Sequence, residues 1–508
     1  MNHIFRSLLA AVLIGMAASR APALDSPVPS RPNIVYILCD DLGIGDVHAF
    51  NPDRCKIPTP NFDRLATQGM RFTDAHATSA LCTPSRYGIL TGRYNWRSPL
   101  QTGVLNGDSL PLLEPGRLTV PAMLKTFGYT TVVLGKWHLG LQWDAQRYHG
   151  SIIDGPLQHG FDHFYGISAS LDMPPFAWID DTRFTEFPSA TKKFVRNGPA
   201  APSFEAVDML PTLRKKAVDF LNAHAVRAGE TAAAKQPFFL YIALPSPHTP
   251  LVPSAKWQGK SPLGTYGDYV METDDEVGQI IDALDAANLG SSTLIYFTSD
   301  NGFAPYVGVK PLEAKGHFPS AQFRGYKSDI WDGGHRIPLI VRWPGVVKPG
   351  STYEPMVSLS DLTATTAQIT GFKVPDNAGE DSVSMLPALR GDPKPIRDFE
   401  IQHSMDGNFA VRLGSWKLEL CAGSGGWALP ERAAIKQHLP KVQLYDLSND
   451  IGEQHNVQAE HPDLVAKLTA LIEKSVNDGR TTPGKPQKND VKVDIWKPVT
   501  TAEDTKND

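Results

Sequence analysis

The sequence predicts a layered α/β domain followed by a smaller α+β domain. From residue 32 onward, short apolar runs typical of buried strands alternate with amphipathic helical segments, the pattern of helices packed on both faces of a sheet. Four of the strand-like runs end directly in polar residues. Hydrophobic residues make up 41% and charged residues 20% of the 508 positions, as in an ordinary globular protein long enough for more than one domain.

The four runs cover residues 33–38, 130–134, 238–244 and 294–298. They are followed by Asp40 and Asp41, by Lys136 and His138, by His248, and by Asp300 and Asn301. In open α/β sheets, ligands bind outside the carboxyl ends of the strands. We therefore expect these polar side chains to converge in one crevice.

Helices are predicted over residues 209–225 and 274–289, where apolar residues recur at helical spacing and Gly290 suits the second end. The first domain is predicted over residues 24–392, with a boundary after Asp392. A second domain over 393–480 combines strand-like pieces at 409–413, 416–420 and 443–447 with a helix at 462–476. Residues 481–508 are polar and are predicted to form an extended or mobile tail.

The first 23 residues have the features of a secretory signal peptide. Arg6 precedes an apolar run over 8–18, and Ala21-Pro22-Ala23 provides a small-residue cleavage site, so the exported chain is expected to begin near Leu24. The run is short for a membrane span, although a retained membrane anchor is the alternative interpretation. We therefore expect an exported protein, periplasmic or secreted, with no membrane span after signal removal.

Net charge and cysteine spacing narrow the function classes. The formal net charge of −5 gives no general surface for polyanions, so nucleic acid is not an expected partner and any anion site must be local. The four cysteines show neither a disulfide framework nor a C-x-x-C motif. Pairing among Cys39, Cys55 and Cys421 stays open, because an exported protein can form disulfides.

Asp40, Asp41, Asp300 and Asn301 together offer three carboxylates and one amide oxygen. Oxygen ligands without histidine or thiolate suit calcium or magnesium rather than zinc. Adjacent aspartates also occur in turns and helix caps, and Ser-Asp-Asn-Gly is a common turn sequence. Because like charges side by side are costly unless a cation holds them, the pattern favours a metal site.

Cys82 lies in the segment Leu81-Cys82-Thr83-Pro84-Ser85-Arg86, which is closed by Thr91-Gly92-Arg93. Pro84 suits the first turn of a helix and Gly92 its end, so Cys82 is expected at a helix N-terminus. The free N–H groups and the dipole there favour an anion. The alternative is a buried structural cysteine, since free cysteines are usually interior.

The Cys82 segment resembles the maturation signature of the type I sulfatases. In that family a maturation enzyme oxidises the cysteine to formylglycine, an aldehyde whose hydrate attacks the sulfur of a sulfate ester. Further segments resemble the same family in order along residues 32–392: Gly-Lys-Trp-His-Leu-Gly at 135–140, Pro-Ser-Pro-His-Thr-Pro at 245–250, Phe-Arg-Gly-Tyr-Lys at 323–327, and the later Leu-Tyr-Asp-Leu at 444–447. The resemblance implies an alkaline-phosphatase-like mixed sheet sandwiched by helices, with a smaller C-terminal domain.

The resemblance also implies one calcium ion, a sulfated glycan as substrate, and a role for each matching residue. Asp40, Asp41, Asp300, Asn301 and the modified Cys82 would hold the calcium, and Arg86 would hold the hydrated aldehyde. Lys136 and Lys327 would bind the sulfate, His248 would protonate the leaving alkoxide, and His138 would act as the base that regenerates the aldehyde. A second hydroxyl on the hydrate lets the sulfated intermediate collapse to sulfate and aldehyde, which a plain cysteine or serine ester does not do.

Two further substrate contacts, Ser170 and His335, are supported by weaker matches to the segments of the family. Ser170 follows a stretch, residues 160–166, after which relatives place a serine contact. Relatives have Glu before the pair matching Gly333-Gly334 and a small or apolar residue after it, whereas this chain has Asp332 and His335. His335 is therefore either a substrate contact or a polar surface residue.

Two other functions are alternatives. A phosphoester or phosphonate hydrolase of the same superfamily generally has more metal-binding carboxylates and histidines, and a catalytically silent glycan-binding protein would have broken motifs. The segments 257–261 and 266–269 resemble bacterial sulfatases that tend toward 6-O-sulfated galactose or N-acetylgalactosamine. Further candidate sugar contacts are Asp172, Trp178 and Arg183.

Overall fold

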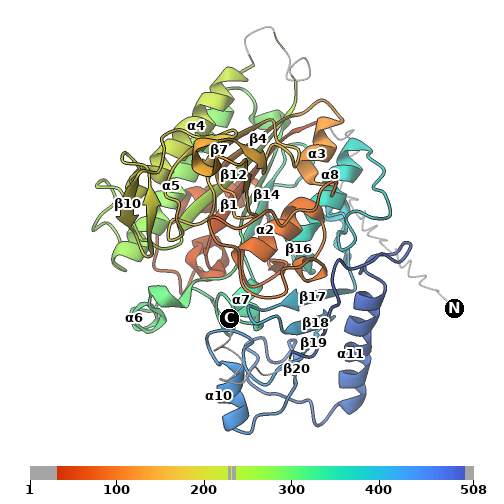
Figure 1. The fold of residues 1–508 in the computed structure, drawn as a ribbon. Coiled ribbons are helices and arrows are strands. Elements are labelled where there is room, and N and C mark those ends of the chain that lie inside the picture. Colours follow the sequence, from red (N-terminus) through yellow and green to blue (C-terminus); the bar gives the residue numbers. More distant parts are fainter. Residues whose placement is uncertain (1–30, 227–229, 231–235, 498–508) are drawn as a thin grey trace, which may run out of the picture.

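The computed structural model describes residues 31–226, 230 and 236–497, which form a large domain and, below it in Figure 1, a smaller C-terminal domain. The predicted signal peptide and the last part of the tail lie outside the described residues. Within the described ranges, no helix is both long and apolar enough to cross a membrane.

In the part of the chain that the structure describes, the large domain is built on a ten-stranded mixed sheet. Its central strands β13, β1, β12, β4 and β7 are parallel neighbours, and β14 runs antiparallel beside β13. In spatial order the strands are β15 (Ser351–Tyr353), β2 (Met70–Phe72), β14 (Leu339–Arg342), β13 (Thr293–Ser299), β1 (Asn33–Asp40), β12 (Phe238–Pro247), β4 (Thr130–Lys136), β7 (His163–Ile167), β8 (Ile179–Asp180) and β9 (Arg183–Phe184).

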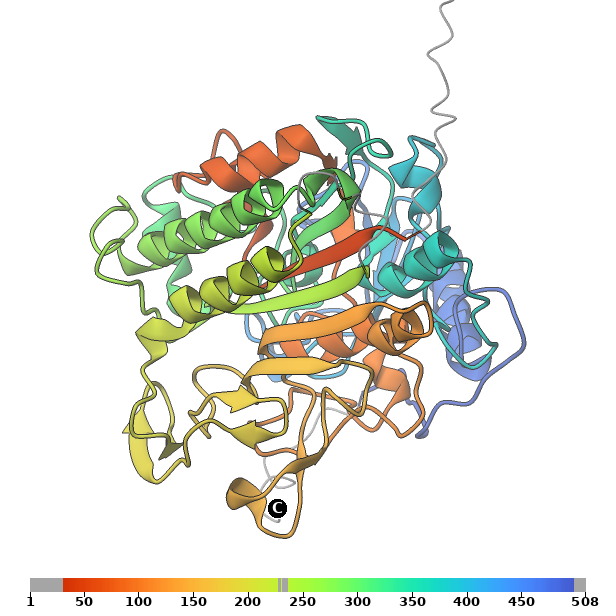
Figure 2. The ribbon, with the colours of Figure 1, turned by 90° about the horizontal axis from the view of Figure 1, so that it is seen from above.

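Side-chain alternation along the central strands builds a hydrophobic core on each face of the sheet. On β1, Val35 and Ile37 enter one core, whereas Ile34 and Tyr36 enter the other. Figure 2 shows helices covering both faces. The helices on the first face are α1 (Pro60–Gln68), α4 (Met209–Ala223) and α5 (Thr265–Ala286), and those on the second are α2 (Cys82–Thr91), α3 (Val120–Lys125) and α8 (Leu362–Thr370). The predicted α/β layering is confirmed.

Helix ends depart from the prediction in places where tertiary packing extends the apolar face. α5 begins at Thr265 rather than at residue 274, because Tyr269 and Val270 are also buried against the sheet. α2 begins at Cys82 itself and stops at Thr91, where Gly92 adopts φ +67°, a conformation that favours glycine. The Cys82 segment therefore forms a helix start, as its sequence predicts.

A separate antiparallel sheet forms the C-terminal domain, in the order β17 (Phe399–His403), β18 (Phe409–Leu413), β19 (Trp416–Glu419) and β20 (Gln443–Asp446). α11 (Pro462–Asn477) packs on this sheet, and the short α10 (Glu431–Lys436) precedes β20. Tyr94 and Trp96 of the large domain belong to the same core as the sheet, so the two domains are packed together. The exact boundary at residue 392 stays a prediction.

Residues 481–497 contain no helix or strand, yet they contact the large domain. Asp490 pairs with Arg93 at 2.8 Å, and the Ile495 side chain is buried. This part of the tail is therefore extended and docked. All four cysteines are buried and free, so no disulfide joins them.

The remaining elements are short connections around these two domains. They are β3 (Ala75–His76), β5 (Gln142–Trp143), β6 (Ile152–Asp154), β10 (Ala190–Lys193), β11 (Asn197–Ala200), β16 (Val357–Ser358), α6 (Val309–Glu313), α7 (Asp332–His335) and α9 (Leu386–Leu389).

Candidate active site

The polar ends of four parallel strands meet at one edge of the sheet. β1 ends at Asp40 and β4 at Lys136, while β12 and β13 end directly before His248 and Asp300. The strand register places β1 between β12 and β13, and β4 beside β12, so these ends lie next to one another. The predicted convergence is confirmed.

Three buried carboxylates at this edge each contact a buried cation from another segment. Lys136 Nζ donates to Asp40 Oδ2 at 2.7 Å, Lys327 Nζ donates to Asp41 Oδ2 at 2.9 Å, and Arg86 Nη2 donates to Asp300 Oδ2 at 2.7 Å. Burial alone would raise the pKa of Asp40, but Lys136, His248 and Arg86 hold it well below its ordinary value. Burial lowers and Asp41 raises the pKa of Lys327, whose net shift is upward, so this lysine stays charged.

The same oxygens fit a hard cation. Burial and the neighbouring Asp40 raise the pKa of Asp300 despite its pairing with Arg86, because like charges are crowded together here. Asn301 donates its amide to Asp41 Oδ1 at 2.7 Å, while its own Oδ1 is buried without a hydrogen-bond partner among the described residues. An unpartnered amide oxygen beside three carboxylates is a donor set typical of calcium.

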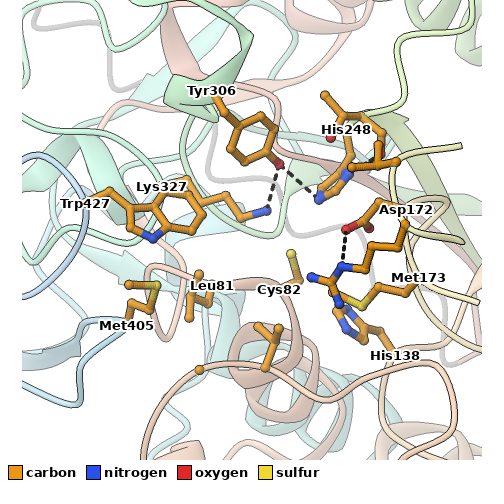
Figure 3. Close-up of a pocket in the computed structure, with 15 residues that line it drawn as sticks. Leu81, Cys82, His138, Asp172, Met173, His248, Tyr306, Lys327, Met405 and Trp427 are labelled. Carbon is orange, nitrogen blue, oxygen red and sulfur yellow. Dashed lines mark hydrogen bonds and ion pairs between the residues drawn. The ribbon is translucent and has the colours of Figure 1, made fainter. Parts of the chain in front are cut away.

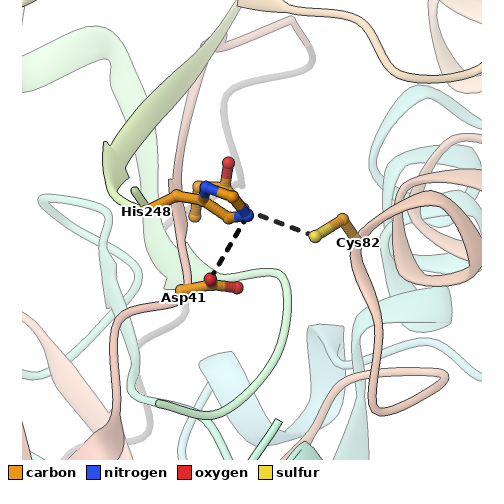
Figure 4. Close-up of side chains that lie close together, drawn as sticks. Asp41, Cys82 and His248 are labelled. Carbon is orange, nitrogen blue, oxygen red and sulfur yellow. Dashed lines mark hydrogen bonds and ion pairs between the residues drawn. The ribbon is translucent and has the colours of Figure 1, made fainter. Parts of the chain in front are cut away.

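Cys82 begins α2 and faces this cluster. Its Sγ lies 3.5 Å from Asp40 Oδ1, and ligand atoms of Asp40, Asp41, Cys82 and His248 all fall within 4.8 Å of one another. Figure 4 shows Asp41, Cys82 and His248 close together. Burial and Asp300 raise the pKa of the Cys82 thiol well above its ordinary value. The unmodified thiol is therefore protonated and a poor nucleophile.

Two histidines lie on either side of Cys82. His138 contacts the Leu105 carbonyl through Nε2 at 2.8 Å, so Nδ1, which has no partner within the described chain, is the free basic nitrogen. Burial, Lys136 and Arg86 lower the pKa of His138, which keeps it neutral. His248 contacts the Thr249 carbonyl through Nδ1 at 2.6 Å and the Tyr306 hydroxyl through Nε2 at 3.1 Å.

Two of the residues at this edge have strained backbones. Asp41 adopts φ +66° and His138 adopts φ +59°, in the left-handed region that few residues other than glycine occupy. Such conformations persist where surrounding contacts hold them, and they concentrate at functional sites. Both residues were singled out in the sequence by their positions after strands and by the family resemblance.

A cavity of about 430 Å³ adjoins the cluster. Figure 3 shows the residues that line it. Cys82, His138, His248 and Lys327 line it, so four of the sequence-predicted site residues face a space that a ligand can enter. Asp40, Asp41, Arg86, Lys136, Asp300 and Asn301 are almost fully buried and do not line it. They form the floor on which the exposed groups are held.

Ser170 belongs to the floor and does not line the cavity. It is buried, accepts a hydrogen bond from Lys136 Nζ at 3.1 Å and lies 3.4 Å from Asp40 Oδ2. Its contacts in the structure therefore place Lys136 instead of reaching the open space.

The prediction that His335 faces the substrate is wrong. His335 is fully buried, and its ring contacts His76 at 2.9 Å and the Ile330 carbonyl at 3.0 Å. It lies in α7, and Lys417 of the C-terminal domain approaches it from the other side. His335, which the sequence suggested as a substrate contact or a surface residue, is therefore packed between the two domains.

The three further sugar-contact candidates separate in the structure. Asp172 lines the cavity, where it pairs with Arg196 at 3.6 Å. Trp178 stacks on Tyr165 and Arg183 lies in β9, and neither lines the cavity.

Sequence reasoning missed several cavity residues. Tyr306 follows Asp300 and Asn301 in the same connection, and its hydroxyl donates to Asp41 Oδ2 at 2.7 Å. Its nearness to the predicted metal ligands was the signal that could have found it. Met405 and Trp427 come from the C-terminal domain, which no local motif links to the site.

Comparisons with known proteins agree with this geometry. The Sulfatase family model matches residues 32–372, which is more than half of the chain. The chain belongs to the sulfatase family. The sulfatase is therefore a sulfuric ester hydrolase, and neither of the two alternative functions is favoured.

Two of the matches, one to a curated sequence and one to a solved structure, come from Bacteroides thetaiotaomicron. The sulfatase is 32% identical to a curated N-acetylgalactosamine-6-O-sulfatase, with 87% of this chain and 93% of that protein covered. A solved structure from a study of glycosaminoglycan metabolism in this bacterium is also 32% identical, with a TM-score of 0.77 over 88% of this chain and 99% of that one.

A phosphonate monoester hydrolase from Silicibacter pomeroyi shares the fold of the sulfatase. It is 18% identical, with a TM-score of 0.60 over 87% of this chain and 95% of that chain. This likeness shows the common fold and confirms the predicted architecture, but it says nothing about the reaction.

Proposed function

We propose that this sulfatase removes the 6-O-sulfate from galactose or N-acetylgalactosamine residues of glycans, and that Cys82 acts after conversion to formylglycine. The observation that carries the proposal is the placement of Cys82 at a helix start, on the cavity wall and beside the acidic cluster. The sugar is supported by the Bacteroides relative, which is an N-acetylgalactosamine-6-O-sulfatase. The high pKa of the bare thiol supports a modified side chain as the reacting group.

The formylglycine hydrate, once formed by a maturation enzyme, supplies an oxygen nucleophile toward sulfur. Lys327 lines the cavity and stays charged, so it binds the sulfate oxygens from the open side. Lys136 lies on the floor, where Asp40 and Ser170 orient its ammonium group. Together the two lysines stabilise negative charge on the sulfuryl oxygens.

The two histidines divide the proton transfers. His248 Nε2 lies in the cavity wall, where it can donate a proton to the departing alkoxide oxygen. His138 is neutral with a free Nδ1, and it accepts a proton from the modified side chain when sulfate is released. Arg86 is anchored to Asp300 and to the Lys136 carbonyl, which fixes the donors that hold the side chain at position 82.

Calcium is the metal that we propose for the acidic cluster. Asp40, Asp41, Asp300 and Asn301 would hold it, with the modified Cys82 as a further ligand. When bound, such an ion lowers the pKa of a coordinated hydroxyl and neutralises sulfate charge.

Export is part of the same proposal. Residues 1–23 carry the pattern of a cleavable signal, and a sulfatase acting on large glycans requires access to them outside the cytoplasm. Whether the sulfatase is periplasmic or secreted is decided by fractionation of the native cells.

The test is sulfate release by matured protein from 6-O-sulfogalactose, 6-O-sulfo-N-acetylgalactosamine and 6-O-sulfoglucosamine. Release from the two galacto sugars, absent in Cys82→Ala, supports the proposal. Mass spectrometry of the peptide that contains residue 82 shows whether the thiol has become an aldehyde. Release from the gluco sugar alone, or activity in Cys82→Ala, would overturn it.

A further inference from the structure

A second cavity adjoins the one above Cys82. Its volume is about 350 Å³, and Met173 and Arg196 line both cavities. The reaction proposed above uses only the first cavity. Because the two share a wall, a ligand longer than one sugar can occupy both.

Arg196 joins the two cavities. Its guanidinium lies 3.6 Å from Asp172 Oδ2, which lines the first cavity, and donates to Asn106 Oδ1 at 3.1 Å in the second. Arg196 lies in the connection between β10 and β11, and its side chain is 50% exposed. Its remaining donors are thus held where two neighbouring sugar rings would meet.

The second cavity has a closely packed floor. A Cβ on Gly198 would lie 2.4 Å from Pro174 Cβ, and one on Gly107 would lie 2.1 Å from the Pro174 carbonyl oxygen. Both positions therefore need glycine, because three separate segments approach one another at Pro174. The Phe176 amide also donates to the Pro199 carbonyl at 2.9 Å, which fixes β11 against this floor.

The chemistry of the lining suits a sugar. Asn106, Asn197, Asp108 and Tyr148 surround the space with amide, carboxylate and phenol groups. Among the described lining residues, one carboxylate and one guanidinium give no excess of positive charge for a second sulfate. Hydroxyl groups of a pyranose ring can both donate to and accept from such groups, and a volume of about 350 Å³ is at the small end of ligand sites.

We propose that the second cavity binds the sugar residue next to the sulfated one. The sulfatase therefore prefers oligosaccharides over monosaccharides. This inference rests on the proposed function, because it takes the first cavity as the site of the sulfated sugar.

The test compares 6-O-sulfo-N-acetylgalactosamine with two disaccharides that join it to unsulfated galactose, on its reducing or its non-reducing side. Wild-type protein is expected to show kcat/KM about 10-fold higher for one disaccharide than for the monosaccharide, as two or three added hydrogen bonds would give. Asn197→Trp fills the second cavity, so it should remove this advantage and leave the monosaccharide rate unchanged. Lys193→Trp is the matched control, because Lys193 pairs with Asn197 across the hairpin and lines neither cavity.

Equal rates on monosaccharide and disaccharides in the wild type would overturn the inference, as would an Asn197→Trp protein that loses both activities equally. Calorimetry on Cys82→Ala gives a second measurement that needs no turnover. Tighter binding of a sulfated disaccharide than of the monosaccharide, lost in the double variant with Asn197→Trp, supports the second subsite. Failure of the proposed function is distinct, because it would appear as no sulfate release from the monosaccharide either.

Discussion

Two buried ionic clusters in this chain differ in what they can do. The first is the acidic cluster of Asp40, Asp41, Asp300 and Asn301 beneath Cys82. The second, which we name the interdomain cluster, consists of His76, Asp332, His335, Lys417 and Glu453. Possible metal ligands gather in both places: Asp40 and Asp41 with Cys82 and His248 at the first, and His76, Asp332 and His335 at the second.

Access to a cavity separates the two clusters, since each contains a buried oxygen without a hydrogen-bond partner among the described residues, at Asn301 and at Asp332. The acidic cluster lies under a cavity and keeps an unpartnered amide oxygen at Asn301. Both clusters contain buried cations. In the interdomain cluster Lys417 Nζ contacts Asp332 at 2.9 Å and Glu453 at 2.6 Å, but no member of that cluster lines the cavity. Buried charge alone is thus weak support for catalysis, whereas buried charge facing an open space is strong support.

The largest expected effect is on the reaction itself. Cys82→Ala should lower sulfate release by about 10⁴-fold or more, as loss of a nucleophile does in other hydrolases. Cys55→Ala is the control, since Cys55 is also buried but lies outside the cavity lining. Sulfate-release assays with thermal melts check both variants, and comparable losses in the two would contradict the assignment of Cys82.

A substitution in the interdomain cluster should lower the stability of the protein instead of its activity. Lys417→Met leaves buried carboxylates without their cation, so the free energy of unfolding should fall by about 3–5 kcal/mol. Lys441→Met replaces an exposed lysine before β20 and should change stability little. Denaturant titrations measure the difference, and the folded fraction of Lys417→Met should still release sulfate. A stable but inactive Lys417→Met protein would place the interdomain cluster in the reaction.

Substitutions in the two clusters should also differ in their effect on calcium affinity. Asn301→Ala removes the unpartnered oxygen and should weaken calcium binding by about 10- to 100-fold. Asp332→Asn should leave calcium affinity within about 2-fold of wild type, since Lys417 already occupies that cluster. Calorimetric titration of chelator-treated protein measures both affinities. Equal losses of calcium affinity in the two variants would mean that access to the cavity does not distinguish the two clusters.

The sequence predicted the acidic cluster well and the interdomain cluster not at all. Asp40, Lys136, His248 and Asp300 were predicted to lie together because each stands at or directly after the end of a strand. Parallel strands bring their carboxyl ends together. His335 was misplaced because Lys417 of the C-terminal domain packs against it, whereas the role of Ser170 stays a prediction. Local periodicity carries no information on which domain covers a residue, and Trp427 was missed for the same reason.

The helices were predicted where one face is apolar, and their ends where a glycine or proline stands. Gly92 ended α2 as expected, but α5 began earlier than its apolar stripe indicated. Polar residues such as Asp268 and Glu272 are buried along its first half, so tertiary contacts override the pattern there.

The smallest effect that we predict concerns the hydroxyl by which the acidic cluster reaches the cavity. Tyr306→Phe keeps the ring but removes the group that contacts Asp41 Oδ2 and His248 Nε2. kcat should fall by about 10-fold with little change in KM, because one hydrogen bond to a charged group is lost at the proton donor. Tyr326→Phe, whose hydroxyl contacts Glu313 outside the cavity, should leave both constants unchanged. A raised KM with unchanged kcat would instead make Tyr306 a sugar-binding group. In that case the acidic cluster would reach the cavity only through Lys327, His248 and the side chain of residue 82.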